Sequence, residues 1–347
     1  MAVTDRAEPG RWHQGWCRSG GSPGWAMVSH RHRGAGRGAP VGADRRPPGV
    51  PAGAERGAPA AFAAESARLV GGHRLEYRQP PSAARLIGMT STAEKATLLQ
   101  ELHAAPEPLL VVNVWDAITA KVVAEIPGTR ALATASHGIA ASRGYPDGER
   151  IPRDEMIAEV ALIVRAAGDL PVTADLEAGY GDPGGTIARA IEVGAVGANL
   201  EDQMKPLAES VGAVEAAVAA AEAAGVDFVL NARTDAFLKA GDRDPEEVLA
   251  DAIARGRAYL DAGASNVFVP GRLDVDQVTR LVSELGERKV NLIGVPGSIS
   301  LEVARELGVS RVSYGPWSQN VALTALAELV EDVHAGGGLP AGTRTLN

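Results

Sequence analysis

Short apolar segments rich in β-branched residues recur along residues 89–347, and each precedes a longer Ala-rich stretch of helical period. This alternation is typical of parallel βα units. The segments recur about every 29 residues, and a TIM barrel of eight such units takes about 250 residues. The pattern predicts an α/β fold, a (β/α)8 TIM barrel, with strands in LLVVNV (109–114), ALATAS (131–136), PVTADLE (171–177), GANLED (197–202), FVLNART (228–234), NVFVP (266–270), NLIGVP (291–296) and RVSYGP (311–316).

The segments between these strands carry helix signals. PRDEMIAEVALIVRAAG (152–168) and DPEEVLADAIARGRAYLDAG (244–263) both place Pro in the first turn and end at Gly, as helices commonly do. An open, doubly wound sheet is the alternative architecture. No GxGxxG follows the first predicted strand, however, so the barrel is favoured.

Residues 1–88 differ from the rest of the chain. Gly and Pro make up 24 of these 88 residues, and the apolar positions show no sustained period, so this segment is predicted to be a disordered N-terminal extension. An Arg- and Trp-rich arm that binds nucleic acid is an alternative interpretation. Met89 opens a Ser/Thr-rich start followed by good helix formers, so translation from an upstream start codon also accounts for the extension.

Charge and cysteine usage exclude several classes of protein. The segment 1–88 holds 13 Arg, no Lys and 6 acidic residues, a charge of +7, and the total of −9 leaves −16 for residues 89–347. Nucleic acid is therefore not expected as the main partner. No apolar run reaches the 18 to 20 residues that a membrane span needs, so no membrane partner is expected and the protein is predicted to be cytoplasmic. Cys17 is the one cysteine, which leaves 89–347 without a disulfide or a thiol nucleophile.

Acidic side chains gather where predicted strands end, which is where barrel enzymes place their chemistry. Asp175 and Glu177 lie two residues apart, so they share a face if both are in regular strand, and Glu201 ends the next strand. Such oxygen ligands favour Mg²⁺, or Mn²⁺, over zinc. The competing interpretation is that these acids cap helices or pair with Arg.

Two further side chains are candidates for substrate contact. Arg233 ends the fifth strand, and its planar fork pairs bidentately with a carboxylate, so it can hold an anionic substrate beside a divalent ion. Pairing with Asp235 or Glu201 is the alternative. His137, at the end of the second strand, can act as an acid, a base, a substrate donor or a packing residue.

Four motifs in order, SHGIAASRGYPDGE (136–149), ADLEAGYGD (174–182), GANLED and LNARTDAF (230–237), resemble the isocitrate lyase and phosphoenolpyruvate mutase superfamily. The resemblance implies a (β/α)8 barrel that binds Mg²⁺ and acts on 2-oxo or 2-hydroxy carboxylates, making or breaking a C–C or P–C bond next to an enolate. It also implies a homo-oligomer, a dimer or a tetramer, whose subunits exchange the last helix, here QNVALTALAELVEDVHAG (319–336).

The resemblance assigns roles to residues at matching motif positions. It implies a metal site formed by the carboxylates of Asp175, Glu177 and Glu201, and a catalytic acid near the reacting group, Asp147. It also implies that the substrate carboxylate is bound by Arg233, as a catalytic residue, and by the turn of Ser136, His137 and Gly138.

Two departures from the family patterns narrow the function. Lyases of the isocitrate and 2-methylisocitrate type resemble one another in having a catalytic Cys, which residues 89–347 lack. Phosphoenolpyruvate mutase and phosphonopyruvate hydrolase, which act on P–C bonds, resemble each other in a loop with Lys and an Asn-Ser pair. The loop EDQMKPLAESVGA (201–213) has Lys205 but lacks that pair. The preferred hypothesis is a Mg²⁺-dependent lyase, similar to oxaloacetate decarboxylases, that cleaves a small 2-oxo acid through a pyruvate enolate. Three alternatives stay open: a 2-methylisocitrate-type lyase using Asp147 or His137, P–C chemistry, and a non-catalytic barrel that binds a small carboxylate.

Overall fold

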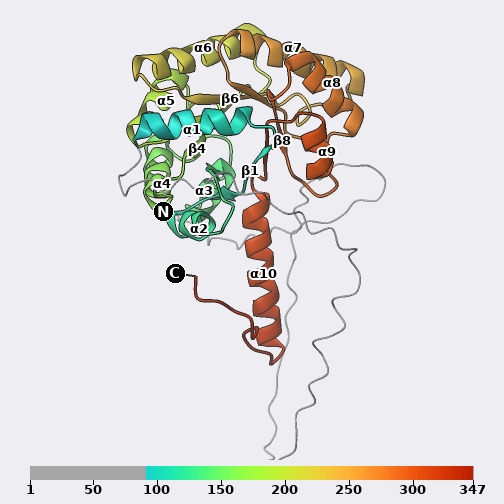
Figure 1. Ribbon diagram of the computed structural model, residues 1–347. Helices are drawn as coiled ribbons and strands as arrows, with labels where there is room; N and C mark the ends of the chain where they lie inside the picture. Colours follow the sequence, from blue (N-terminus) through green and yellow to red (C-terminus); the bar gives the residue numbers. More distant parts are fainter. Residues whose placement is uncertain (1–90, 347) are drawn as a thin grey trace, which may run out of the picture. The chain divides into compact units, whose positions relative to one another are not determined.

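The computed structural model describes residues 91–346, and their strands form one sheet in which every pairing is parallel (Figure 1). The order of strands is β1-β9-β8-β7-β6-β5-β4-β3-β2. Their bounds are β1 (Leu109–Val111), β2 (Asn113–Val114), β3 (Leu132–Thr134), β4 (Val172–Asp175), β5 (Gly197–Glu201), β6 (Val229–Arg233), β7 (Asn266–Phe268), β8 (Val290–Ile293) and β9 (Arg311–Ser313).

The sheet closes through its first stretch of chain. β1 and β2 are two pieces of residues 109–114, interrupted at Val112; β1 pairs with β9 and β2 pairs with β3. The same stretch therefore joins both ends of the strand order. Each of the eight predicted segments contains a strand, so the prediction of a (β/α)8 barrel is confirmed and the open doubly wound alternative is wrong.

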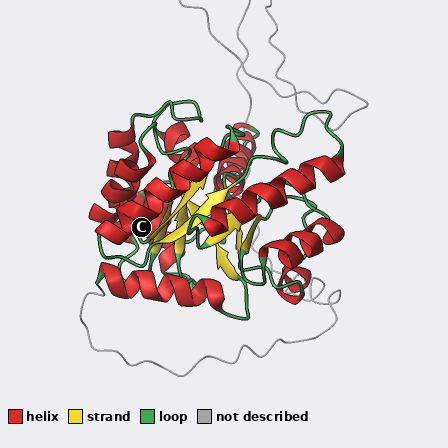
Figure 2. Ribbon diagram, turned by 90° about the horizontal axis from the view of Figure 1, so that it is seen from above, coloured by secondary structure: helices red, strands yellow, loops and turns green. Residues whose placement is uncertain are grey.

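Helices surround the sheet on its outer face (Figure 2). The two helices predicted from Pro and Gly signals are confirmed as α4 and α7, and Asp244 caps α7 by accepting from the Glu246 amide. The helices are α1 (Thr92–Ala104), α2 (Ala117–Ala124), α3 (Ser136–Ser142), α4 (Arg153–Ala166), α5 (Pro183–Glu192), α6 (Leu207–Ala223), α7 (Pro245–Asp261), α8 (Val275–Leu285), α9 (Leu301–Glu306) and α10 (Trp317–His334).

Helix α1 closes the amino-terminal end of the barrel. Its Leu99 and Leu102 share a buried apolar cluster with Val111 and Val229. Leu99 also approaches the first residue of β5 so closely that a Cβ on Gly197 would lie 2.9 Å from its Cδ2. The opposite end, where the strands reach their carboxyl ends, is the one left for chemistry.

Helix α10 extends away from the barrel instead of covering the sheet (Figure 1). Gln319 is its one buried residue, while apolar side chains such as Val321 and Leu326 are 70% and 55% exposed. On the barrel itself, Leu110 and Val112 are also exposed. Within the described chain, an apolar helix face and an apolar strand face are thus left without a covering element.

The predicted disordered extension, residues 1–88, lies outside the described residues, so it stays a prediction. Among residues 91–346, no helix has both the length and the apolar character that crossing a bilayer requires.

Candidate active site

The charged residues predicted at the strand ends converge at the carboxyl end of the barrel. Asp175 is the last residue of β4, Glu201 of β5 and Arg233 of β6. The strand register places Asp175 opposite Asn199 and Glu201 opposite Arg233. Because these strands are adjacent and parallel, their terminal side chains meet at one edge, as the sequence predicted.

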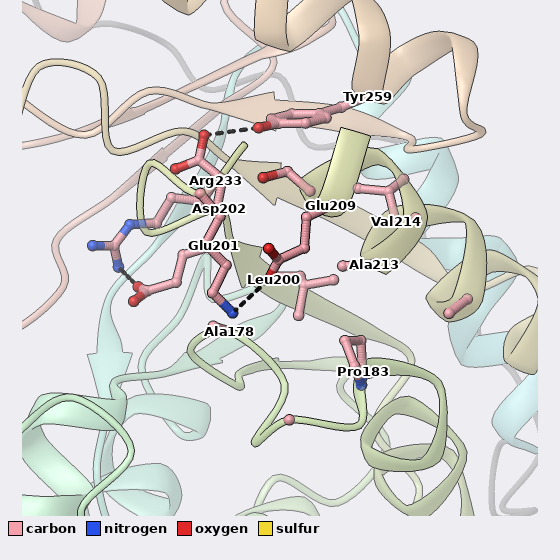
Figure 3. Close-up of a pocket in the computed structure, with 15 residues that line it drawn as sticks. Ala178, Pro183, Leu200, Glu201, Asp202, Glu209, Ala213, Val214, Arg233 and Tyr259 are labelled. Carbon is pink, nitrogen blue, oxygen red and sulfur yellow. Dashed lines mark hydrogen bonds and ion pairs between the residues drawn. The ribbon is translucent and has the colours of Figure 1, made fainter. Parts of the chain in front are cut away.

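Arg233 is held by two carboxylates. Its Nη1 lies 2.7 Å from Oε2 of Glu201 (Figure 3). Its Nε donates to Oδ1 of Asp235 at 2.8 Å. Burial lowers the pKa of Arg233, but the charges of Glu201 and Asp235 outweigh this effect and the net pKa is raised. Arg233 therefore pairs with both Glu201 and Asp235 in this structure, which is the alternative that the sequence left open.

Asp175 is fixed through one oxygen and one backbone group. Its Oδ2 accepts from the amide and the hydroxyl of Ser136, at 3.1 and 2.8 Å, and its own amide donates to Oγ1 of Thr134. Its Oδ1 is buried and has no hydrogen-bond partner in the protein. A buried carboxylate oxygen without a partner is costly, so Oδ1 is suited to an external ligand.

Glu177 differs from the prediction, because β4 ends at Asp175 and Glu177 lies in the left-handed region with φ 52°. Its carboxylate accepts from the Tyr180 hydroxyl at 3.2 Å and from the Glu149 amide. Burial, followed by the charges of Asp147 and Asp175, raises the pKa of Glu177 to about 7. The two acids therefore do not share a strand face, and a loop orients Glu177 instead.

Glu201 has a similar electrostatic setting. Burial raises the pKa of Glu201 to about 7, with Asp235 and Asp175 adding to the rise and Arg233 opposing it. Burial is the largest cause of the raised pKa of both Glu177 and Glu201, and the charge of Asp175 adds to both. A site with these acids gains stability from a bound cation.

His137 and Asp147 form a second, more open pair. His137 Nδ1 lies 3.5 Å from Asp147 Oδ2, and both side chains are about half exposed. The bond to Asp147 raises the pKa of His137, and the same bond lowers the pKa of Asp147. The two residues can therefore hold a proton at the mouth of the barrel.

Replacing Asp147 by Asn should lower the pKa of His137, because the largest cause of its rise is the bond to this carboxylate. A histidine with a raised pKa stays protonated to higher pH, so the variant should lose the imidazole proton at lower pH than the unchanged protein. NMR titration of the imidazole signals measures this directly. An unchanged midpoint would contradict the pairing.

The predicted substrate-binding turn, Ser136 to Gly138, is the first turn of helix α3. The Ser136 hydroxyl donates to Asp175. Gly138 packs tightly, since a Cβ there would lie 3.0 Å from the Cβ of Trp115, and its carbonyl accepts from Gln319 Nε2. In this structure Ser136 thus orients Asp175, and the absence of a side chain at Gly138 allows Trp115 and Gln319 to pack closely against it.

Comparison with known proteins assigns the family. The family model described as phosphoenolpyruvate phosphomutase matches residues 99–334. The chain belongs to this family. It is 32% identical over 242 residues to an uncharacterised protein of Mycobacterium tuberculosis, an alignment that covers 69% of this chain and 90% of that protein. Its homologues include lyases and mutases. The chain therefore belongs to the isocitrate lyase and phosphoenolpyruvate mutase superfamily of enzymes.

Solved structures agree with this assignment. A putative phosphonomutase from Burkholderia cenocepacia is 41% identical with a TM-score of 0.65, covering 70% of this chain and 99% of that one. Oxaloacetate acetylhydrolase in complex with oxalate is 28% identical with a TM-score of 0.65, covering 74% of this chain and 92% of that one. Members of the superfamily generally depend on a divalent metal.

The acidic side chains at the strand ends offer oxygen ligands for such a metal. Among residues 91–346, no three His, Cys, Asp or Glu side chains come close enough to ligate one ion together. Mg²⁺, however, is usually bound by one or two carboxylates and keeps several waters. The unpartnered Oδ1 of Asp175 fits a direct ligand of this kind. The carboxylates of Glu177 and Glu201 already have partners within the protein.

Sequence reasoning missed the supports of this family site. Glu149, at the end of the GYPDGE motif, donates its amide to Glu177, and its carboxylate accepts from the Tyr180 amide at 2.5 Å. Both Glu149 and Tyr180 have positive φ. The glycines around Tyr180 indicated such a turn, but nothing in the sequence indicated the contact between the two loops.

Asp202 is a second missed support. Its Oδ2 accepts from the Tyr259 hydroxyl at 2.7 Å (Figure 3). The same oxygen accepts from Arg255 Nη1 at 3.2 Å, and Oδ1 accepts from the Asp235 amide at 3.0 Å. It therefore ties the end of β5 to β6 and α7, and so fixes Asp235 beside Arg233. A cavity of about 330 Å³ opens next to these residues.

Proposed function

We propose that the protein is a divalent-metal-dependent lyase that cleaves a C–C bond of a small 2-oxo dicarboxylate such as oxaloacetate. The observation that carries the proposal is the unpartnered Oδ1 of Asp175 at the same strand edge as the Arg233 guanidinium. The Asp175 oxygen can bind a cation, and the nearby guanidinium can bind a carboxylate. This combination suits a carboxylate substrate that also chelates the metal.

The proposed metal ligand is Asp175, with Glu177 and Glu201 acting through water. The proposed ion is Mg²⁺, with Mn²⁺ as the alternative. The chemistry that such an ion supplies is Lewis-acid stabilisation of negative charge on an enolate oxygen. Ser136 orients Asp175 for this role by donating two hydrogen bonds to Oδ2.

Arg233 is proposed to bind the C1 carboxylate of the substrate. To do so it exchanges one of its present partners, Glu201 or Asp235, for the substrate. The C3–C4 bond then breaks, CO₂ leaves, and C3 takes up a proton to give pyruvate. We assign this proton to the His137–Asp147 pair, because Asp147 keeps the imidazole protonated to higher pH.

The products from oxaloacetate test the reaction type. The proposal expects pyruvate and CO₂ in equal amounts, whereas cleavage of the C2–C3 bond would give oxalate and acetate. Oxalate formation would therefore overturn the decarboxylase part of the proposal. Phosphonopyruvate belongs in the same assay, because the chain is 41% identical to a putative phosphonomutase, and turnover of it alone would favour P–C chemistry.

We also propose that the protein is a homo-oligomer in which α10 packs on the barrel of another copy. Leu323, Leu326, Val330 and Val333 are spaced by three and four residues, so they share one helix face, and all are exposed. The uncovered Leu110 on β1 offers an apolar surface of the kind that such a helix covers.

Replacing Leu326 by Asp should shift the protein toward the monomer, because it puts a charge into an apolar contact. The matched control is Thr324→Asp, an exposed residue on the opposite face of α10, which should leave the oligomer intact. Light scattering coupled to gel filtration gives the mass of each variant. Equal masses for the two variants would contradict the proposed contact.

A further inference from the structure

A fully buried arginine lies inside the barrel. Arg311 is the first residue of β9 and is 1% exposed, and none of its Nε, Nη1 and Nη2 atoms has a hydrogen-bond partner in the protein. Leaving a buried guanidinium without a partner is strongly destabilising. Something other than a direct protein contact must therefore satisfy it.

Other unpartnered polar atoms come from the surrounding strands. Asn291, the partner of Arg311 in the register of β8, is fully buried, and both atoms of its amide group lack partners. Asn231 on β6 donates to Asn199 at 2.7 Å, but its own Oδ1 is unpartnered. Like Oδ1 of Asp175, these are buried polar atoms without a partner on strands of the barrel.

Arg311 lies near the closing helix α1, because the hydroxyl of Ser310, the residue before it, donates to the His103 carbonyl at 3.1 Å. Burial, and then the charge of Arg311, lower the pKa of His103 on the closing helix α1 to about 3. Burial lowers the pKa of Arg311 itself to about 10, while the charge of Asp175 raises it. Arg311 thus stays charged at neutral pH, within the field of Asp175 and near α1.

The chemistry of the unpartnered atoms identifies the ligand class. Arg311 and the Asn291 Nδ2 are donors, whereas Asn291 Oδ1, Asn231 Oδ1 and Asp175 Oδ1 are acceptors. A halide only accepts hydrogen bonds, so it serves the donors alone. Water donates and accepts, and it commonly fills polar sites of this kind in protein interiors.

We propose that ordered water in the barrel core connects the guanidinium of Arg311 to Oδ1 of Asp175, which makes Arg311 a positioning residue and an internal counter-charge for the acidic site. Each carboxylate oxygen has two acceptor sites, so this contact does not exclude a metal on the same atom. The inference concerns the metal-free protein and holds whichever substrate is used.

A double-mutant cycle on the full chain, measured as thermal midpoints with chelator present, tests the coupling. The variants are Arg311→Met, Asp175→Asn and the double variant. We expect Arg311→Met to be less harmful, or even stabilising, when Asp175 is already neutral, with a deviation from additivity of about 4 °C or more. Arg311→Lys keeps the charge and should keep most of the coupling to Asp175.

The control cycle pairs Arg311→Met with Asp182→Asn, an exposed acid that caps α5, and it should be additive. Additivity in the Asp175 cycle as well would overturn the proposal, because a merely structural role of Arg311 does not depend on the charge at residue 175. None of these readouts needs turnover, so their outcome is independent of the proposed reaction.

A crystal structure of the unchanged protein, with a bromide soak, gives the second test and does not depend on the folding of any variant. We expect water density between Arg311 and Asp175 and no anomalous signal beside Arg311. A bromide peak beside Arg311 would show that an anion, and not water, occupies this site. A direct protein partner for Arg311 would remove the need for water, and either result would overturn the proposal.

Discussion

Replacing Asp175 by Asn should reduce turnover of oxaloacetate by at least about 100-fold. Losing a residue that only supports a metal ligand costs up to about 100-fold, and losing the ligand itself should cost no less. The change keeps the shape of the side chain but removes the charge of the carboxylate whose Oδ1 is free for a cation. Isothermal titration with Mg²⁺ should show a loss of affinity of similar size.

The matched control is Asp182→Asn, seven residues further along. Asp182 caps α5 and pairs with Arg153, so this variant should lose some stability and keep both Mg²⁺ affinity and turnover. If Asp175→Asn bound Mg²⁺ and turned over substrate as the control does, the assignment of Asp175 as the metal ligand would be wrong.

Replacing Arg233 by Met should raise the KM for oxaloacetate by at least about 30-fold, the equivalent of about 2 kcal/mol for a charge pair lost from a binding site. The variant should also be less stable by about 3 kcal/mol, because Glu201 and Asp235, which are 12% and 4% exposed, lose their cation. Steady-state kinetics and urea unfolding measure the two effects separately.

The variant Arg233→Lys separates the effect of bidentate hydrogen bonding by the guanidinium from the effect of its positive charge. Lysine keeps the positive charge but cannot pair bidentately, so most of the stability should return while the KM stays high. Recovery of both quantities in this variant would contradict a specific role for the guanidinium. An unchanged KM in Arg233→Met would show that another group binds the substrate carboxylate.

The barrel was predictable because each strand and helix leaves a local signal in the sequence. The apolar runs at 109–114 and 228–234, for example, contain β1, β2 and β6, and the Pro before Glu246 marks the start of α7. The course of α10 away from the barrel was not readable from periodicity, because a helix with an apolar face has the same pattern whether its own barrel or another copy covers it.

The site was predictable only as far as strand ends determine it. Asp175, Glu201 and Arg233 end adjacent strands, so their meeting follows from the order of the strands. Glu177 is oriented by a left-handed turn, which a sequence announces reliably only at glycine. Arg311 was missed because a strand buried on both faces does not reveal which side chains enter the core.

The measurement that tests the central claim most directly is pyruvate release from oxaloacetate by the full chain with Mg²⁺, against the same reaction with chelator and against Mg²⁺ without protein. The account predicts saturable release, well above the metal-only rate, that is lost with chelator and in Asp175→Asn. Release no faster than metal alone, or release that survives the chelator, would contradict it.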